Sequence, residues 1–202
     1  MFKEFYNKLY SENEITYEDG KPDDIVEDIL KFKSFGSALE IGAGEGRNAL
    51  FLAEHEFQTT AQDISQVGIE KINKLSKEKH IDIKTEISDV RSLNLNCNFD
   101  VLVCSSMLHQ LTREEALKLI EQIKEHTNPE GLNVIKTFTE NGDFYRTNPD
   151  TNNFYVKNDE LQKLYEGWEI LEYKESESEA HKQNPDGSQM INISAKILAK
   201  KI

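Results

Sequence analysis

The chain lacks the features that would place it in a membrane or hold it together covalently. No apolar run approaches the roughly 18 residues of a membrane span, and the first residues have no signal-peptide hydrophobic region. It has two cysteines, Cys97 and Cys104, which form neither a C-x-x-C motif nor a metal pattern. We therefore expect two core thiols, no bound metal and a cytoplasmic protein.

Basic residues are also scarce. The 24 lysines and arginines face 37 acidic residues, for a net charge of −13. Such a charge opposes attraction to nucleic-acid phosphates and favours small-molecule partners. The sequence has no internal repeat or low-complexity tract, and 202 residues fit one domain with a substantial core. We predict a single domain over residues 1–202, with no nucleic-acid or membrane partner, and leave its oligomeric state open.

Glycines gather at one place that organises the rest of the chain. The apolar run 38–41 predicts a buried strand, and the segment 49–53 predicts the helix that follows. Gly42, Gly44 and Gly46 lie in the turn between them. Glycine permits positive φ and lets a ligand approach the backbone, and the first amides of a helix are unpaired donors. This turn is typical of a nucleotide-cofactor site.

The spacing and charge of this turn select among cofactors. A dinucleotide fingerprint, G-x-G-x-x-G, would place its third glycine at Arg47, whereas this chain has G-x-G-x-G. Glu40, just before the turn, would repel a diphosphate but attract an amino-acid ammonium. S-adenosylmethionine carries such an ammonium and no phosphate. A nicotinamide-dependent oxidoreductase is therefore disfavoured.

Acidic residues follow the next two predicted strands. Asp63 ends the segment 58–63 at the distance along the chain expected for a carboxylate that binds ribose hydroxyls. Asp89 and Val90 follow the strand predicted over 81–87, where they would offer an acceptor and an apolar wall to adenine. The alternative is that Asp89 is only a turn or cap residue.

The remaining pattern predicts an α/β protein of alternating strands and helices that ends in a hairpin. We expect an N-terminal helical or lid segment over 1–35, a cofactor-binding core over 36–138, and a substrate-side loop and hairpin over 139–202. Predicted strands cover 99–105, 132–138, 169–173 and 191–199. Ser65, Thr112 and Asn158 are the predicted helix caps, and 174–179 is predicted to be a solvated charged segment.

Three further segments are assigned to the site or its surroundings. The aromatic residues within 2–10 either pack on the domain or form a lid over the cleft. The polar stretch 139–153 is a candidate substrate cover. Ser105, Met107 and His109 follow the predicted central strand, where open α/β sheets bind ligands. His109 is either a base or a loop residue without a chemical role.

These residues resemble the class I S-adenosylmethionine-dependent methyltransferases. The matches are the first motif at 40–46, the ribose acid Asp63, the adenine contact at 89–90 and the turn 128–131. The resemblance implies a Rossmann-like fold with a seven-stranded, mostly parallel sheet, an antiparallel last strand and helices on both faces. It also implies S-adenosylmethionine as cofactor, held by Glu40, Gly42, Ala43, Gly44, Gly46, Arg47, Asn48, Asp63, Ile64, Asp89, Val90, Ser105 and Met107.

A narrower resemblance covers most of the chain. Segments 44–48, 165–169 and 179–181 are similar to the tellurite-resistance methyltransferase family. This implies methyl transfer to small oxyanions or other soft nucleophiles, with His181 and Lys182 as the catalytic candidates. The family has arginines where this chain has Lys182 and Gln189. Because arginine forks bind oxyanions better than lysine does, tellurite or selenite is a less favoured acceptor than a small thiol.

Two alternatives accompany this prediction. The chain is either a methyltransferase for another small metabolite, or a protein that binds S-adenosylmethionine without turnover. His181 either orients or deprotonates the acceptor, or is a partly exposed histidine of a polar loop.

Overall fold

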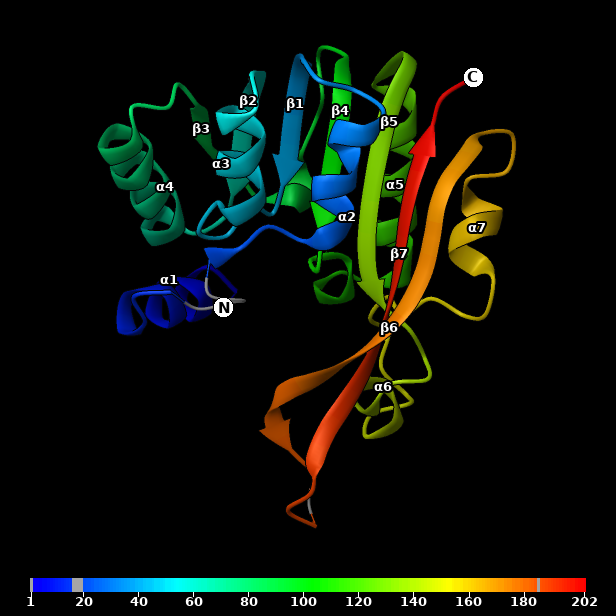
Figure 1. Ribbon diagram of the computed structural model, residues 1–202. Coiled ribbons are helices and arrows are strands. Elements are labelled where there is room, and N and C mark those ends of the chain that lie inside the picture. Colours follow the sequence, from blue (N-terminus) through cyan, green and yellow to red (C-terminus); the bar gives the residue numbers. More distant parts are fainter. Residues whose placement is uncertain (1, 16–19, 185) are drawn as a thin grey trace.

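The computed structural model describes residues 2–15, 20–184 and 186–202, and the side chains of 180–182 lie outside the described part. Its centre is a seven-stranded sheet with the order β3-β2-β1-β4-β5-β7-β6 (Figure 1). The strands are β1 Gly36–Ile41, β2 Phe57–Asp63, β3 Lys84–Ile87, β4 Phe99–Ser105, β5 Thr127–Phe138, β6 Glu169–Gln183 and β7 Gln189–Lys200.

The sheet is mixed in the way the sequence predicts. Strands β1 to β5 pair in parallel, and β7 runs antiparallel between β5 and β6. The strand predicted to be central, β4, is the fourth in the order. It is apolar along most of its length because its side chains enter a core on each face, Val101 and Val103 on one side and Leu102 and Cys104 on the other.

Helices cover both faces of this sheet. Helices α2 Asp24–Glu27, α3 Arg47–Glu54 and α4 Gln66–Lys79, with the 3₁₀ turn η2 Asp28–Lys31, pack on one face. Helices α5 Arg113–Glu125 and α7 Glu160–Leu164 pack on the other. Short 3₁₀ turns, η3 Val90–Ser92 and η4 Leu108–Gln110, follow β3 and β4. Two buried layers thus sandwich the sheet.

The predicted helix caps are correct in two places and wrong in one. Ser65 Oγ accepts from Gly68 N at 3.1 Å, and Thr112 forms a capping box with Glu115. Asn158 does not cap α7; the N-cap position is Asp159, in a left-handed conformation with no side-chain cap bond. The Asn158 Oδ1 atom instead accepts from the Asn141 amide at 3.0 Å. A tertiary contact has replaced the local one.

Three other predictions need correction. The strand predicted over 169–173 continues through 174–179, because every residue of that segment pairs with β7, while four of its six residues are exposed as the prediction of a solvated segment requires. Strand β3 begins at Lys84, three residues later than predicted. Cys97 is exposed in the loop before β4, and only Cys104 is a core thiol.

The carboxyl ends of the parallel strands collect the less regular elements. Helices α1 Phe2–Glu12 and α6 Asp143–Arg146, and the outer half of the β6–β7 hairpin, extend below this edge in Figure 1. Helix α6 lies within the segment 139–153 that the sequence predicts to be a loop. No helix among the described residues is long and apolar enough to cross a membrane.

Candidate functional site

A cleft of about 1610 Å³ opens at the carboxyl edge of the sheet. It extends from the glycine turn and α1 to the ends of β5, β7 and β6. Single small-molecule sites measure roughly 300–1,000 Å³. The cleft therefore has room for a cofactor and a second small molecule.

The glycine turn, residues 42–46, lies at the end of the cleft where the sequence predicts the cofactor, which we call the cofactor half. Gly42 N and Ala43 N donate to the Gln62 carbonyl at 2.8 and 2.9 Å, which ties the turn to β2. Gly42, Gly44 and Gly46 have φ values of 74°, 58° and 86°, a region that favours glycine. The sequence prediction that these glycines set the turn is confirmed.

The three glycines differ in what they face. A Cβ on Gly42 would lie 2.7 Å from the Met107 side chain, and one on Gly44 would lie 2.9 Å from the Tyr10 hydroxyl. A Cβ on Gly46 would lie 2.5 Å from Ile72 of α4, and Gly46 does not line the cleft. Gly46 therefore serves helix packing, and its contact with the cofactor stays a prediction.

Asp63 and Asp89 both reach the cleft, with different partners. Asp63 accepts Gly44 N at 2.8 Å and Ser65 N at 2.7 Å, and burial raises its pKa. Asp89 forms a two-pronged ion pair with Arg91, at 2.9 and 2.7 Å, which lowers its pKa. Asp63 thus braces the glycine turn, and Asp89 also starts η3.

Glu40 is the buried acid of the site. Its side chain is 2% exposed, and burial raises its pKa to about 8. Asn48 donates to Oε1 at 2.8 Å, whereas Oε2 has no hydrogen-bond partner in the described part of the chain. A buried acceptor without a partner calls for one. An ammonium placed in the cleft beside Glu40 would supply it, so the site fits the cofactor that the sequence predicts.

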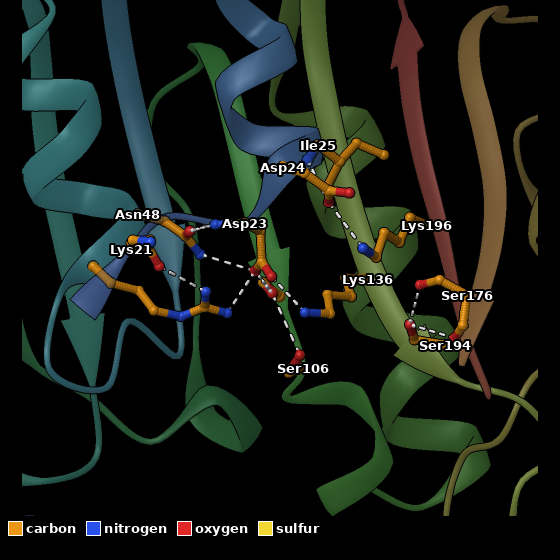
Figure 2. A network of polar contacts seen from close by, with 12 residues as sticks. Lys21, Asp23, Asp24, Ile25, Asn48, Ser106, Lys136, Ser176, Ser194 and Lys196 are labelled. Atoms are coloured by element: carbon orange, nitrogen blue, oxygen red, sulfur yellow. Dashed lines mark hydrogen bonds and ion pairs between the residues drawn. The ribbon is translucent and has the colours of Figure 1, made fainter. Parts of the chain in front are cut away.

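Arg47 and Asn48 connect the glycine turn to the segment before α2. Arg47 donates to Asp23 at 2.8 Å and to the Lys21 carbonyl at 2.9 Å, and Asn48 Oδ1 accepts Asp23 N at 2.8 Å (Figure 2). Both residues line the cleft. Their contacts in the structure hold the N-terminal segment against the turn.

Sequence reasoning missed Asp23 and Lys136. Lys136 of β5 pairs with Asp23 (Figure 2). Asp23 also accepts a hydrogen bond from Ser105 of β4. Burial opposes ionisation of Asp23, but Lys136 and Arg47 outweigh it and hold its pKa at about 2. A lysine inside an otherwise apolar strand needs a buried acidic partner, so the position of Lys136 in the sequence could have indicated a buried ion pair. Its partner, 113 residues earlier, could not be identified locally.

The other half of the cleft has an aromatic wall. The His109 and Phe138 rings lie 4.7 Å apart, and Phe138 and Phe144 lie 5.5 Å apart, each pair edge to face. Burial lowers the pKa of His109 to about 4, so its imidazole is neutral at pH 7. His109 Nδ1 is buried without a hydrogen-bond partner among the described residues. The wall is aromatic and uncharged at pH 7.

The predicted catalytic pair cannot be placed in this cleft. The backbone of His181 and Lys182 belongs to β6, but their side chains are outside the described residues. Gln189 begins β7, is exposed and pairs in register with Gln183. Of the other predicted cofactor residues, Ala43, Ile64, Val90, Ser105 and Met107 line the cleft.

Known proteins are similar to this chain in sequence and in fold. A family model described as tellurite resistance protein TehB matches residues 2–198. A relative from Haemophilus influenzae, named probable S-adenosyl-L-methionine-dependent methyltransferase TehB, is 31% identical over 176 residues. That match covers 87% of this chain and 61% of the relative, so the chain spans about three fifths of the relative's length.

Solved structures agree with the family match. The crystal structure of TehB from Haemophilus influenzae has a TM-score of 0.79 and 28% identity, and the match covers 98% of this chain and 67% of that chain. The N-methyltransferase NodS from Bradyrhizobium japonicum, in complex with S-adenosyl-L-homocysteine, has a TM-score of 0.71 at 15% identity, covering 98% and 97%. The second likeness concerns the fold alone. The chain therefore belongs to the tellurite resistance protein TehB family and has the class I fold of S-adenosylmethionine-dependent methyltransferases.

Proposed function

We propose that this protein transfers the methyl group of S-adenosylmethionine to a small soft nucleophile, a thiol or a chalcogen oxyanion. One observation carries the proposal. One cleft is lined by Glu40, Gly44, Asp63 and Asp89, and the buried Oε2 atom of Glu40 has no hydrogen-bond partner among the described residues. Family membership supports the same function.

The cofactor would be held by the residues of the first half of the cleft. Glu40 would face the ammonium, Asp63 the ribose hydroxyls, and Asp89 with Val90 the adenine. When bound, S-adenosylmethionine supplies an already activated methyl group. The chain's own residues then align the acceptor and exclude water, and no metal is required.

The acceptor gains its methyl group by in-line displacement. Its lone pair forms the new bond to carbon while the carbon–sulfonium bond breaks and leaves its electron pair on the departing sulfur. His181 would orient or deprotonate the acceptor, with Lys182 beside it. Because Lys182 and Gln189 stand where the family has arginines, we favour a small thiol over tellurite or selenite.

A paired assay tests this function. Purified protein receives methyl-labelled S-adenosylmethionine with tellurite, selenite or a panel of small thiols. The native protein should methylate a thiol best, and His181→Ala should slow that reaction. The double change Lys182→Arg with Gln189→Arg should raise oxyanion methylation. Efficient oxyanion methylation by the native protein, without a gain in the double variant, would contradict the thiol preference.

Binding without turnover is the runner-up. It predicts that the protein binds S-adenosylmethionine and S-adenosylhomocysteine but labels no acceptor in that panel. A nicotinamide cofactor, the third candidate, would have to bind more tightly than S-adenosylmethionine in a direct calorimetric comparison.

A further inference from the structure

Three lysines lie side by side across the sheet at its carboxyl edge. Lys136 of β5 is directly opposite Lys196 of β7, and Lys196 is directly opposite Lys174 of β6. We call these residues the lysine row. Like charges in this position destabilise a sheet, and lysine is rarely buried. Lys136 and Lys196 are nevertheless each only 8% exposed.

Two consecutive aspartates before and within α2 neutralise part of the row. Asp23 contacts Lys136 and Arg47. Asp24 contacts Lys196, as Figure 2 shows, and Lys174, each at 2.8 Å. Each aspartate is therefore shared by two cations. Glu172 adds a second carboxylate at 3.2 Å, but only for Lys174, at the outer end. Lys136 and Lys196 therefore each share their aspartate with one further cation.

The inner part of the row belongs to the cleft and the outer part does not. Lys136 and Lys196 line the cleft, whereas Lys174 is absent from its lining. The described contacts join Lys196 Nζ to Asp24 Oδ1 alone, and an ammonium has three N–H donors. Lys196 can therefore hold a second acceptor without releasing Asp24.

Hydroxyl groups continue the row toward the aromatic wall. Ser194 of β7 and Ser176 of β6 are paired in register, with their Oγ atoms 3.2 Å apart, and both line the cleft. Ser194 is also in register with Phe138. Glu177 and Glu179 of β6 border the cleft as well, but strand alternation directs their side chains to the face opposite Ser176.

We propose that Lys196, with Ser194 and Ser176, is the carboxylate-binding subsite for the methyl acceptor, and that the acceptor is a small thiol that also carries a carboxylate. This inference rests on the proposed methyl transfer. An ammonium and a hydroxyl together match the acceptor-only chemistry of a carboxylate. The thiol sulfur then lies toward Phe138 and Phe144, because sulfur packs favourably against aromatic rings. Lys136, beside Ser105, adds positive charge near the reacting end.

The test compares two probes that differ in one end group, 3-mercaptopropionate and 3-mercapto-1-propanol. Each is titrated calorimetrically into protein saturated with S-adenosylhomocysteine, and each is then assayed as acceptor with labelled S-adenosylmethionine. The native protein should bind the acid about tenfold more tightly than the alcohol, the difference expected of one charge-assisted contact. Lys196→Gln should abolish that preference by weakening the binding of 3-mercaptopropionate, while the affinity for 3-mercapto-1-propanol stays unchanged. Lys196→Arg should keep most of the preference.

Lys174→Gln is the matched control, because it removes the other lysine partner of Asp24 without touching the cleft. It should keep the preference for the acid. Circular dichroism and the affinity for S-adenosylhomocysteine, both expected to be native in all three variants, exclude a folding defect. Equal binding of acid and alcohol by the native protein, or an unchanged preference in Lys196→Gln, would overturn the subsite. Tight acid binding without methylation of either probe would instead contradict the proposed function.

Discussion

Among single residues, Glu40 is the one whose burial should affect both stability and cofactor binding. With a pKa of about 8, it is mostly protonated at pH 7. This raised pKa makes ionised Glu40 unfavourable for folding, so its contribution to stability declines as the pH rises from its ordinary value of 4.5 toward 8. A cationic group in the cleft would offset that effect by favouring the carboxylate.

We therefore predict that S-adenosylhomocysteine binding at pH 7 releases a proton from Glu40. Calorimetry in two buffers of different ionisation enthalpy measures the number of protons released. Glu40→Gln should release fewer protons and bind about tenfold more weakly, as expected for the loss of one charge-assisted contact. Proton release that is identical in the variant would show that Glu40 does not ionise on binding.

Asp63 acts both on the ligand and on the glycine turn. Asp63→Ala should weaken S-adenosylhomocysteine binding by about 1–3 kcal/mol, because it removes the acceptors proposed for the ribose hydroxyls and the acceptor for Gly44 N. Asp63→Asn retains one oxygen and should lose less. Calorimetry measures both, and native affinity in the alanine variant would remove Asp63 from the site.

The glycine turn is an element in which neighbouring residues have different roles. Gly44→Val should abolish cofactor binding, since its side chain would intrude at the cleft and at the tip of Tyr10, and it should lower Tm moderately because valine is strained at a φ of 58°. Gly46→Val should instead lower Tm strongly, because its Cβ would collide with Ile72 in the core between α3 and α4. Thermal denaturation and calorimetry on both variants separate the two effects. A folded Gly44→Val protein with native binding would mean that the turn is purely structural.

The segment before α2 is fixed to the sheet through Asp23. Its folded pKa, about 2, lies below the ordinary value of 3.8, so its stabilisation is full above 3.8 and is lost as the pH falls toward 2. Asp23→Asn should cost about 3 kcal/mol at pH 7, because it leaves Lys136 buried without its carboxylate. It should also flatten the loss of stability below pH 4. Urea denaturation at several pH values tests this, and an unchanged acid limb would assign the acid sensitivity elsewhere.

The net charge acts on the whole molecule. With −13 charges, the protein repels an anionic acceptor at long range, and salt shortens that repulsion from about 30 Å at 0.01 M to about 8 Å at 0.15 M. Buried contacts such as those of Lys196 are screened less. Affinity for 3-mercaptopropionate should therefore improve about twofold over this range, while 3-mercapto-1-propanol should be unaffected. Calorimetry at both salt concentrations tests this prediction. A weaker affinity for 3-mercaptopropionate at the higher salt concentration would show that attraction to the local cations outweighs the long-range repulsion.

The sequence by itself determined the alternation of elements and the cofactor half of the cleft. An apolar run in the sequence predicts strand β4. Ser65 and Thr112 cap their helices through contacts within three residues of the chain. Glu40, Gly44 and Asp63 could be placed together because parallel strands all end at one edge of a sheet. These features depend on local periodicity or on a rule of topology.

Tertiary structure alone decided the other half of the cleft, at β5, β6 and β7, which we propose for the acceptor. The charged segment 174–179 is largely exposed, as predicted, but its sequence does not indicate that it pairs with β7 and brings Lys174 and Ser176 beside Lys196 and Ser194. Lys136 and Asp23 meet across 113 residues, and Gly46 meets Ile72 of another helix. Such contacts have no sequence period, because strand register and helix packing fix them. The reason is physical: a buried charge is tolerable only where its distant partner arrives, and only the folded chain specifies that place.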